Sequence, residues 1–197
     1  MAPLPPSVRR FAIDALPATP WKNGGGSTRE VASWPPGAGF EGFDWRVSIA
    51  TIAASGPFSR FPGVDRVITL LEGDGVQLRG DGIDHRLAEP FAPFAFSGDA
   101  AIDCALLGGA SSDFNVMTRR GRLRAELRVL RRAAALPAAP HGLLLAWRGD
   151  WQANDASLTA GQGLWWADAD IATARAWRLD TAGDDAALLA VLWHGTE

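Results

Sequence analysis

The segment over residues 58–79 constrains the fold more than any other part of the chain, because it combines a shaped loop with two short runs rich in β-forming residues. Pro62 and Gly63 suit the two central positions of a type II turn, since proline fixes φ and glycine tolerates a positive φ. The runs VITLL (67–71) and VQLR (76–79) flank the turn sequence EGDG, a pattern typical of a β-hairpin. Two apolar strands after an arginine-containing loop indicate a β-barrel with a ligand bound near its mouth.

Length and composition describe a globular chain without an obvious macromolecular partner. The 197 residues can bury one good core or two small ones, and 47% are hydrophobic against 21% charged. A net charge of −3 and the lack of a long basic run argue against nucleic acid. No stretch has the length and hydropathy of a membrane span or a secretory leader, so we expect a cytoplasmic protein without membrane contact.

The residues that usually carry metal or thiol chemistry are few and scattered. The single cysteine, Cys104, lies in an apolar run that we expect to be a buried strand, which indicates an inert thiol in a reducing compartment. The three histidines, His85, His141 and His194, form no His-x-His or His-x-x-x-His pattern. We therefore expect no metal and no cofactor. A Gly-x-Ser-x-Gly elbow is also missing, which disfavours a serine hydrolase.

A glycine-rich segment, WKNGGGSTREV, occupies residues 21–31. Three consecutive glycines allow backbone N–H groups to approach a ligand closely. The spacing fits neither the Walker pattern nor the Rossmann fingerprint, and a flexible hairpin connection explains the glycines as well. Lys22 and Asn23, directly before the glycines, favour a functional role for the segment.

Two segments read as strands with one polar face. In residues 44–52, a period of two places Arg46 and Ser48 on one side and bulky apolar residues on the other. In an open sheet such a polar side would face solvent, whereas in a small closed barrel it can line a cavity.

The second of these strands covers residues 113–121. Its alternation places Asp113, Asn115, Met117 and Arg119 on one face. An acid, an amide and a guanidinium on one strand face form a preorganised hydrogen-bonding set. The alternative is an exposed strand with an Asp–Arg pair, which contributes little to stability.

The remainder of the chain predicts further strands. Residues 123–136 alternate as a strand does, although their good helix formers also permit a short helix. The prolines at 137–140 mark a plausible boundary, and short apolar runs with several of the nine tryptophans follow it. We therefore predict an all-β fold with an N-terminal barrel over residues 1–136, which holds the ligand site, and a smaller C-terminal β unit over residues 137–197 packed against it.

Four motifs in the same order resemble the HutD/Ves family of the cupin superfamily. They are WKNGGGSTRE (21–30), WRVSIA (45–50), FSRFPGVDR (58–66) and DFNVMTR (113–119). These motifs do not separate a HutD-type from a Ves-type member. The resemblance implies a cupin-like double β-barrel, or bicupin, in one chain. It also implies a regulator associated with histidine utilisation, which senses an intermediate such as formylglutamate or urocanate. Because the His-x-His signature of metal-binding cupins is missing, cupin oxygenase chemistry is disfavoured.

From these observations we expect a metal-free site for a small carboxylate in the N-terminal barrel. Lys22 and Asn23 would stand at its rim, and Arg46 and Ser48 would line its wall. Arg60 or Arg66 would cap its mouth. The polar set would be completed by Asp113, Asn115 and Arg119. An arginine would bind the carboxylate bidentately, and Asn115 would recognise an amide or formyl group. The hypothesis requires Arg46 and Asn115 to share a sheltered face.

Two other functions remain open at this point. One is a metal-independent isomerase, lyase or hydrolase acting on a small acid, with Lys22 or Asp113 as the acid–base group. The other is a protein-interaction module in which the tryptophan-rich C-terminal unit buries a partner or a second copy of the chain, giving a homodimer.

Overall fold

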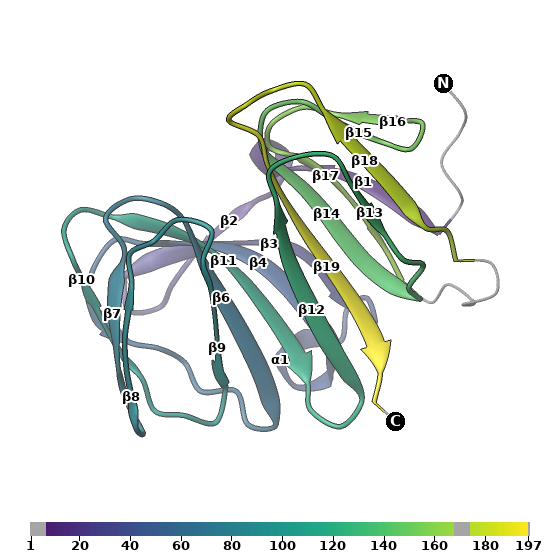
Figure 1. Ribbon diagram of the computed structural model, residues 1–197. Coiled ribbons are helices and arrows are strands. Elements are labelled where there is room, and N and C mark those ends of the chain that lie inside the picture. Colours follow the sequence, from purple (N-terminus) through teal and green to yellow (C-terminus); the bar gives the residue numbers. More distant parts are fainter. Residues whose placement is uncertain (1–6, 168–173, 197) are drawn as a thin grey trace. The chain divides into compact units, whose positions relative to one another are not determined.

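The computed structural model describes residues 7–167 and 174–196, and it divides into two compact units. Residues 17–123 form one of them, here called the central unit, while residues 1–16 and 124–197 form the other, the terminal unit. Both units consist of antiparallel strand pairs, and the only α-helix in the described ranges is α1 (Gly39–Gly42). The prediction of an all-β chain is confirmed (Figure 1).

The central unit contains two antiparallel sheets. The larger has the strand order β2-β3-β4-β11-β6-β9, and the smaller has the order β5-β10-β7-β8. Their bounds are β2 (Ala18–Pro20), β3 (Gly26–Trp34), β4 (Trp45–Ile52), β5 (Gly56–Pro57), β6 (Val64–Glu72), β7 (Val76–Gly80), β8 (Ile83–Leu87), β9 (Pro93–Ser97), β10 (Asp103–Leu106) and β11 (Ser111–Arg119). One face of each sheet is apolar over much of its length, so the two sheets pack face to face. Buried side chains such as Ile68 from β6 and Leu78 from β7 belong to one core between them.

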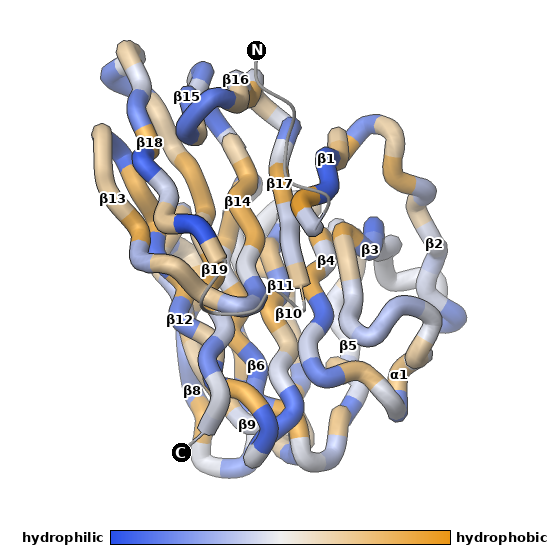
Figure 2. Tube along the Cα trace, turned by 90° about the vertical axis from the view of Figure 1, so that its right-hand side faces the viewer, coloured by the Kyte–Doolittle hydropathy of each residue, from blue (hydrophilic) through white to orange (hydrophobic). Residues whose placement is uncertain are grey.

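The terminal unit also contains two sheets, with the orders β1-β17-β14-β19-β12 and β13-β18-β15-β16. Their bounds are β1 (Val8–Ala12), β12 (Leu123–Leu130), β13 (Ala134–Leu136), β14 (His141–Arg148), β15 (Trp151–Ala153), β16 (Ala156–Leu158), β17 (Gln162–Trp166), β18 (Trp177–Thr181) and β19 (Ala187–Gly195), with a 3₁₀ turn at Ile13–Ala15. Leu144, Trp151 and Trp177 lie in its core. The apolar run of β14 stands out along the chain trace in Figure 2.

The expected double barrel is not confirmed. The strand pairings of the described residues give four open sheets, and none of the four closes on itself. Each unit is therefore a pair of packed sheets. What matters for the site is that a packed pair still has an inner face, and this inner face is sheltered from water in the same way as a barrel interior.

The unit boundaries differ from the expected division at residue 136. β13 pairs with β18, with Ala134 opposite Leu179, so residues before the proline segment belong with the later strands. At the other end of the chain, β1 pairs with β17, with Arg10 opposite Leu164. Pairing of the first strand with one far along the sequence is a non-local feature that strand patterns do not report. Residues 123–130 form a strand, β12, rather than a helix.

The predicted hairpin at residues 67–79 is wrong, although both of its strands exist. β6 pairs with β9 and β11, whereas β7 pairs with β8 and β10, so the turn carries the chain from one sheet to the other. Gly73 and Gly75 have φ values of 95° and 86°, which glycine adopts easily. A Cβ at Gly75 would lie 2.1 Å from the carbonyl oxygen of Leu87, so the corner needs glycine for space as well.

The one α-helix of the described ranges is a single turn of four residues. No helix in residues 7–167 or 174–196 has the length and hydropathy that a membrane span requires.

Candidate functional site

A cluster of buried polar side chains lies on the inner face of β4, β11 and β6 in the central unit. Antiparallel register places Asn115 directly opposite Ser48 on one side and Ile68 on the other. Two positions further along, Met117 lies opposite both Arg46 and Arg66. Side chains of directly opposed residues point to the same face of a sheet. The structure therefore brings Arg46, Ser48, Arg66 and Asn115 onto one face, as the hypothesis requires, with Asp113 on the same face of β11.

Arg46 is held by partners on β3 and β4. Its side chain is 8% exposed, and its Nε donates to Glu30 Oε2 at 2.6 Å. Its Nη1 lies 3.4 Å from Ser48 Oγ, and its guanidinium carbon lies 5.0 Å from the centre of the Phe40 ring. Because the Glu30 side chain is 49% exposed, water screens this ion pair on one side only. Glu30 fixes the guanidinium, and Phe40 covers its face.

Arg66 is a buried cation without an ion pair among the described residues. Only 5% of the residue is exposed, and its Nε has no hydrogen-bond partner. Its Nη1 makes a long contact of 3.4 Å with the Ser59 carbonyl oxygen. The guanidinium lies 5.3, 5.5 and 4.9 Å from the ring centres of Phe58, Phe61 and Phe96. Aromatic faces attract a cation but accept no strong hydrogen bonds, so the Nε donor of Arg66 remains unused.

Burial shifts the pKa of Arg66 without removing its charge. Desolvation lowers the pKa from 12.5 to about 10, opposed by the charge of Asp113 and reinforced by that of Arg46. The side chain is therefore protonated at neutral pH. A buried guanidinium with an unused donor is unfavourable unless an anion or water completes it.

Asp113 and Asn115 add two unpaired acceptors to the same face. Asp113 is 2% exposed and Asn115 is 6% exposed, and the Oδ1 atom of each has no hydrogen-bond partner. Burial raises the pKa of Asp113 from 3.8 to about 7, against the opposing effect of the Arg66 charge. On β10, burial and the negative charge of Asp113 raise the pKa of the Cys104 thiol to about 12. The thiol is therefore protonated and unreactive at neutral pH.

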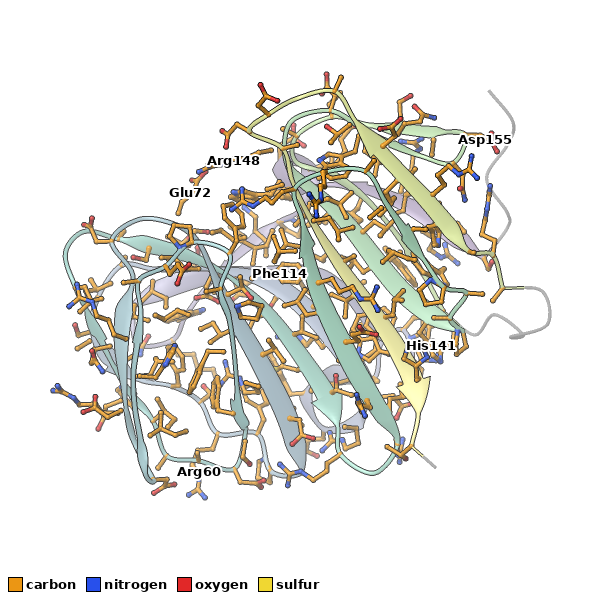
Figure 3. All side chains as sticks on the ribbon, viewed as in Figure 1. Arg60, Glu72, Phe114, His141, Arg148 and Asp155 are labelled. Carbon is orange, nitrogen blue, oxygen red and sulfur yellow. The ribbon has the colours of Figure 1, made fainter. Side chains whose placement is uncertain are left out.

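Three of the four residues expected at the rim and mouth lie on exposed loops, whereas the fourth, Arg66, lies on β6 and is buried. Lys22 and Asn23 are exposed, and Asn23 Oδ1 accepts the N–H of Gly25 at 3.0 Å, which stabilises the glycine turn. Arg60 is also exposed, and its Nε donates to the Asp99 carbonyl oxygen at 2.9 Å. Figure 3 shows Arg60 at the periphery of the central unit, directed away from it. These three residues are not grouped with the buried set.

Arg119 belongs to β11 but is occupied by backbone groups. Its Nη1 and Nη2 donate to the carbonyl oxygens of Pro62 and Glu41 at 3.0 and 2.9 Å, and its Nε lies 3.4 Å from that of Phe43. The guanidinium thus ties together the loops before β4 and before β6. This arrangement gives Arg119 a structural role and leaves it little capacity for a ligand.

The structure adds side chains to the inner face that the sequence interpretation missed. Glu30 of β3 lies opposite Ser48, on the face that also carries Arg46, and the register shifts only after it, between Glu30 and Ala32. The glycines at 24–26 favour a loop in this segment, and a loop assigns no face to Glu30. His85 of β8 stacks on Phe94 at 3.7 Å between ring centres. In the sequence IDHRL of β8, Ile83, His85 and Leu87 alternate with the charged Asp84 and Arg86, and this alternation could have placed His85 inward.

Metal coordination has no support within the described parts of the chain. No three of their histidine, cysteine, aspartate and glutamate side chains cluster closely enough to hold a metal ion. The set described above instead offers two guanidinium donors, an amide and a carboxyl group of raised pKa. Chemically, such a set suits recognition of a small anion with further polar groups.

Comparisons with known proteins agree with the motifs. The HutD family model matches residues 14–189. Protein Ves of Cronobacter sakazakii is 42% identical over 157 residues, which cover 79% of this chain and 85% of that protein.

Solved structures extend the likeness to the whole fold. A conserved protein of unknown function from Pseudomonas aeruginosa PAO1 is 36% identical, with a TM-score of 0.85 over 95% of this chain and 99% of the other. HutD from Pseudomonas fluorescens SBW25, from a formate condition, is 31% identical, with a TM-score of 0.82 over 96% and 100%. Cupin-like structures at 10% and 12% identity, with TM-scores of 0.66 and 0.62, share the fold alone.

Proposed function

The chain belongs to the HutD/Ves family, and on that premise we propose that it is a regulatory protein that binds a small carboxylate in the central unit. The observation that carries the proposal is Arg66. This guanidinium is buried and charged at neutral pH, makes no ion pair within the described residues, and has an unused Nε donor. A bound carboxylate would supply both the missing charge and the missing acceptor.

The balance of charge on the inner face supports an anionic ligand. Arg46 and Arg66 carry two positive charges, and Glu30 compensates one of them at its half-exposed position. Asp113, with a pKa of about 7, is only partly ionised at neutral pH. The face therefore retains positive charge in a water-poor environment, where an anion binds more strongly than it would at an exposed surface.

The spacing of the arginines limits the size of the ligand. Arg46 and Arg66 lie in one row, on the strands that flank β11, so their Cα atoms are about two strand spacings, or roughly 10 Å, apart. Both side chains are long enough to converge from this separation. They suit one shared carboxylate or the two ends of a short dicarboxylate. Formylglutamate and urocanate, intermediates of histidine breakdown, are the candidates. The proposal therefore includes a role in histidine utilisation.

Calorimetric titration of the purified chain with formylglutamate and urocanate tests this function. We expect at least one ligand to bind, and Arg66→Met to weaken binding by roughly 10-fold or more, since a charge-assisted hydrogen bond contributes about 1.5–3 kcal/mol. Arg46→Met should behave similarly. Arg79→Met is the matched control, because Arg79 is exposed and pairs only with the exposed Asp84. Absence of heat from both ligands, or equal binding in all three variants, contradicts the proposal.

One observation favours a second candidate, a metal-independent enzyme. Asp113 is a buried carboxyl with a pKa of about 7, which is the range that general acid–base catalysis requires. An assay for turnover distinguishes the enzyme from the regulator. If the purified chain converts a bound acid, and Asp113→Asn stops conversion while binding persists, the enzyme is supported and the regulator is not.

A further inference from the structure

The inner face of β11 carries two acceptors that nothing in the central unit satisfies. Asp113 and Asn115 stand two positions apart on one face, about 7 Å between their Cα atoms. Their Oδ1 atoms are buried and have no hydrogen-bond partner. The register explains why Asp113 is unpaired, because the residues opposite it are Ala50 and Leu70, which have no side-chain donor.

These acceptors lie at a definite distance from the arginine row. Arg46 and Arg66 flank Met117, which is four positions along β11 from Asp113, or about 13 Å. A ligand whose carboxylate lies at the arginines, and which runs along β11, reaches Asn115 first and Asp113 next. At that end, a second carboxylate or a carbonyl oxygen would face buried acceptors, whereas an N–H or O–H group would satisfy them.

Resting on the proposed function, we propose that Asp113 determines specificity by accepting a hydrogen bond from an N–H donor of the ligand, at the end remote from its arginine-bound carboxylate. The ligand class is then a small acid with an amide, amine or imidazole N–H, rather than a simple carboxylic or dicarboxylic acid. Asn115, one step nearer the arginines, accepts or donates according to the group beside it. A carboxylate accepts more strongly than a neutral amide, so the discrimination depends on the ionised form of Asp113.

The surroundings of Asp113 make this ionisation responsive to a donor. Arg66 on β6 and Cys104 on β10 interact electrostatically with Asp113. Arg46 on β4 and Glu30 on β3 lie on the same sheet face, and His85 on β8 lies on the facing sheet. Among these, the Arg66 charge lowers the pKa of Asp113, while burial raises it to about 7. A hydrogen bond from the ligand would stabilise the carboxylate and lower this pKa further, so binding at pH 7 should release protons.

The test compares two pairs of acids that differ only in the donor. Urocanate is titrated beside 3-(2-furyl)acrylate, whose ring oxygen replaces the ring N–H, and formylglutamate beside its ester analogue with oxygen in place of the amide N–H. For at least one pair we expect the N–H member to bind roughly 10-fold more tightly or better. Its binding heat at pH 7 should differ between phosphate and Tris buffers in the direction of proton release.

The matched variants are Asp113→Asn and, as control, Asp103→Asn, since Asp103 is an exposed acid on β10. Asp113→Asn should reduce the preference for the N–H member to about threefold or less, and the control should retain it. If wild type binds both members of each pair equally, or if Asp113→Asn keeps the preference, the inference is overturned while the proposed function stands. If none of the four acids binds, the proposed function itself fails. If Asp113→Asn does not fold, the inference is decided by whether the wild type prefers the N–H member of each pair.

Discussion

The two units solve the same architectural problem with opposite interiors. Each packs a four-stranded sheet against a larger one, but all the buried polar or charged residues of the described chain lie in the central unit. Those on the inner face are Arg46, Ser48, Arg66, Ser111, Asp113 and Asn115, while Thr69 and Thr118 lie on the other face of the same sheet. The core of the terminal unit is built from alanine, leucine and tryptophan side chains. Since an apolar interior suffices for this architecture, the polar interior of the central unit points to a use other than stability.

The prediction with the largest expected effect on stability places a polar group in the apolar interior of the terminal unit. Leu144 on β14 is fully buried, so Leu144→Asn removes apolar contacts and buries an amide without a partner. We expect the free energy of unfolding to fall by about 4 kcal/mol or more, measured by urea denaturation. Ala135→Asn, at an exposed position of β13, should change it by less than about 0.5 kcal/mol. A tolerated Leu144→Asn would show that the terminal interior accepts polar groups, and the contrast would disappear.

The second test uses pH. The pKa of Asp113 is raised in the folded chain to about 7, so the carboxyl is protonated in both states below about pH 4. Between these values only the unfolded chain has lost the proton, and stability falls as pH rises, then levels off above pH 7. Relative to Asp113→Asn, the unfolding free energy of wild type should fall by on the order of 3 kcal/mol from pH 4.5 to pH 8. Parallel stability curves for the two proteins would contradict the raised pKa, and Asp103→Asn serves as the control.

The third test compares two polar side chains on β11. Ser111 Oγ accepts the Gly75 N–H at 2.8 Å, whereas Asn115 Oδ1 has no partner. Ser111→Ala should lower the unfolding free energy by about 1–2 kcal/mol, because it leaves the Gly75 N–H unpaired. Asn115→Leu should leave it unchanged or raise it by about 1 kcal/mol, while it weakens ligand binding. A loss of stability in Asn115→Leu as large as in Ser111→Ala would mean that Asn115 serves the fold.

The prediction with the smallest expected effect concerns the reactivity of the Cys104 thiol and not the stability of the fold. Cys104 is buried beside the polar cluster, and its pKa is raised to about 12, mainly by burial. Labelling with a thiol reagent at pH 8 should therefore be at least about 100-fold slower in the folded chain than in urea. Asp113→Asn should alter the folded rate little, since the charge of Asp113 is the lesser cause. Rapid labelling of the folded chain would show that water reaches this part of the interior.

Much of this contrast was predictable from alternation alone, because a period of two assigns faces wherever a strand is regular. The polar faces of β4 and β11 followed from Arg46, Ser48, Asp113 and Asn115 in this way, and their register confirms that these residues share one face. Alternation fails at irregular places. It was not applied to Glu30, because the glycines of residues 24–26 favour a loop there, and β3 shifts its register directly after Glu30. It grouped Arg119 with a ligand set because strand parity does not reveal the three carbonyl oxygens around its guanidinium.

Local sequence patterns also did not predict which strands pair with one another. The turn at residues 72–75 has the composition of a hairpin, yet it joins strands of different sheets. Composition reports that the chain reverses or bends, but partner choice depends on which surfaces become buried together. The division at residue 136 followed a proline cluster, whereas the units follow the pairing of β13 with β18 and of β1 with β17.

The pairing of β1 with β17 affects the order in which the protein can fold during synthesis on the ribosome. The central unit is complete once residue 123 has emerged, so its sheets are free to assemble during translation. β1 leaves the ribosome before the strands of the central unit, but it gains its partner only after Leu164 and its neighbours have been made. Closing so long a loop is slow compared with local pairing. β1 is thus among the last of the described strands to pair, and the central unit with its polar interior can complete its sheets before the terminal unit does.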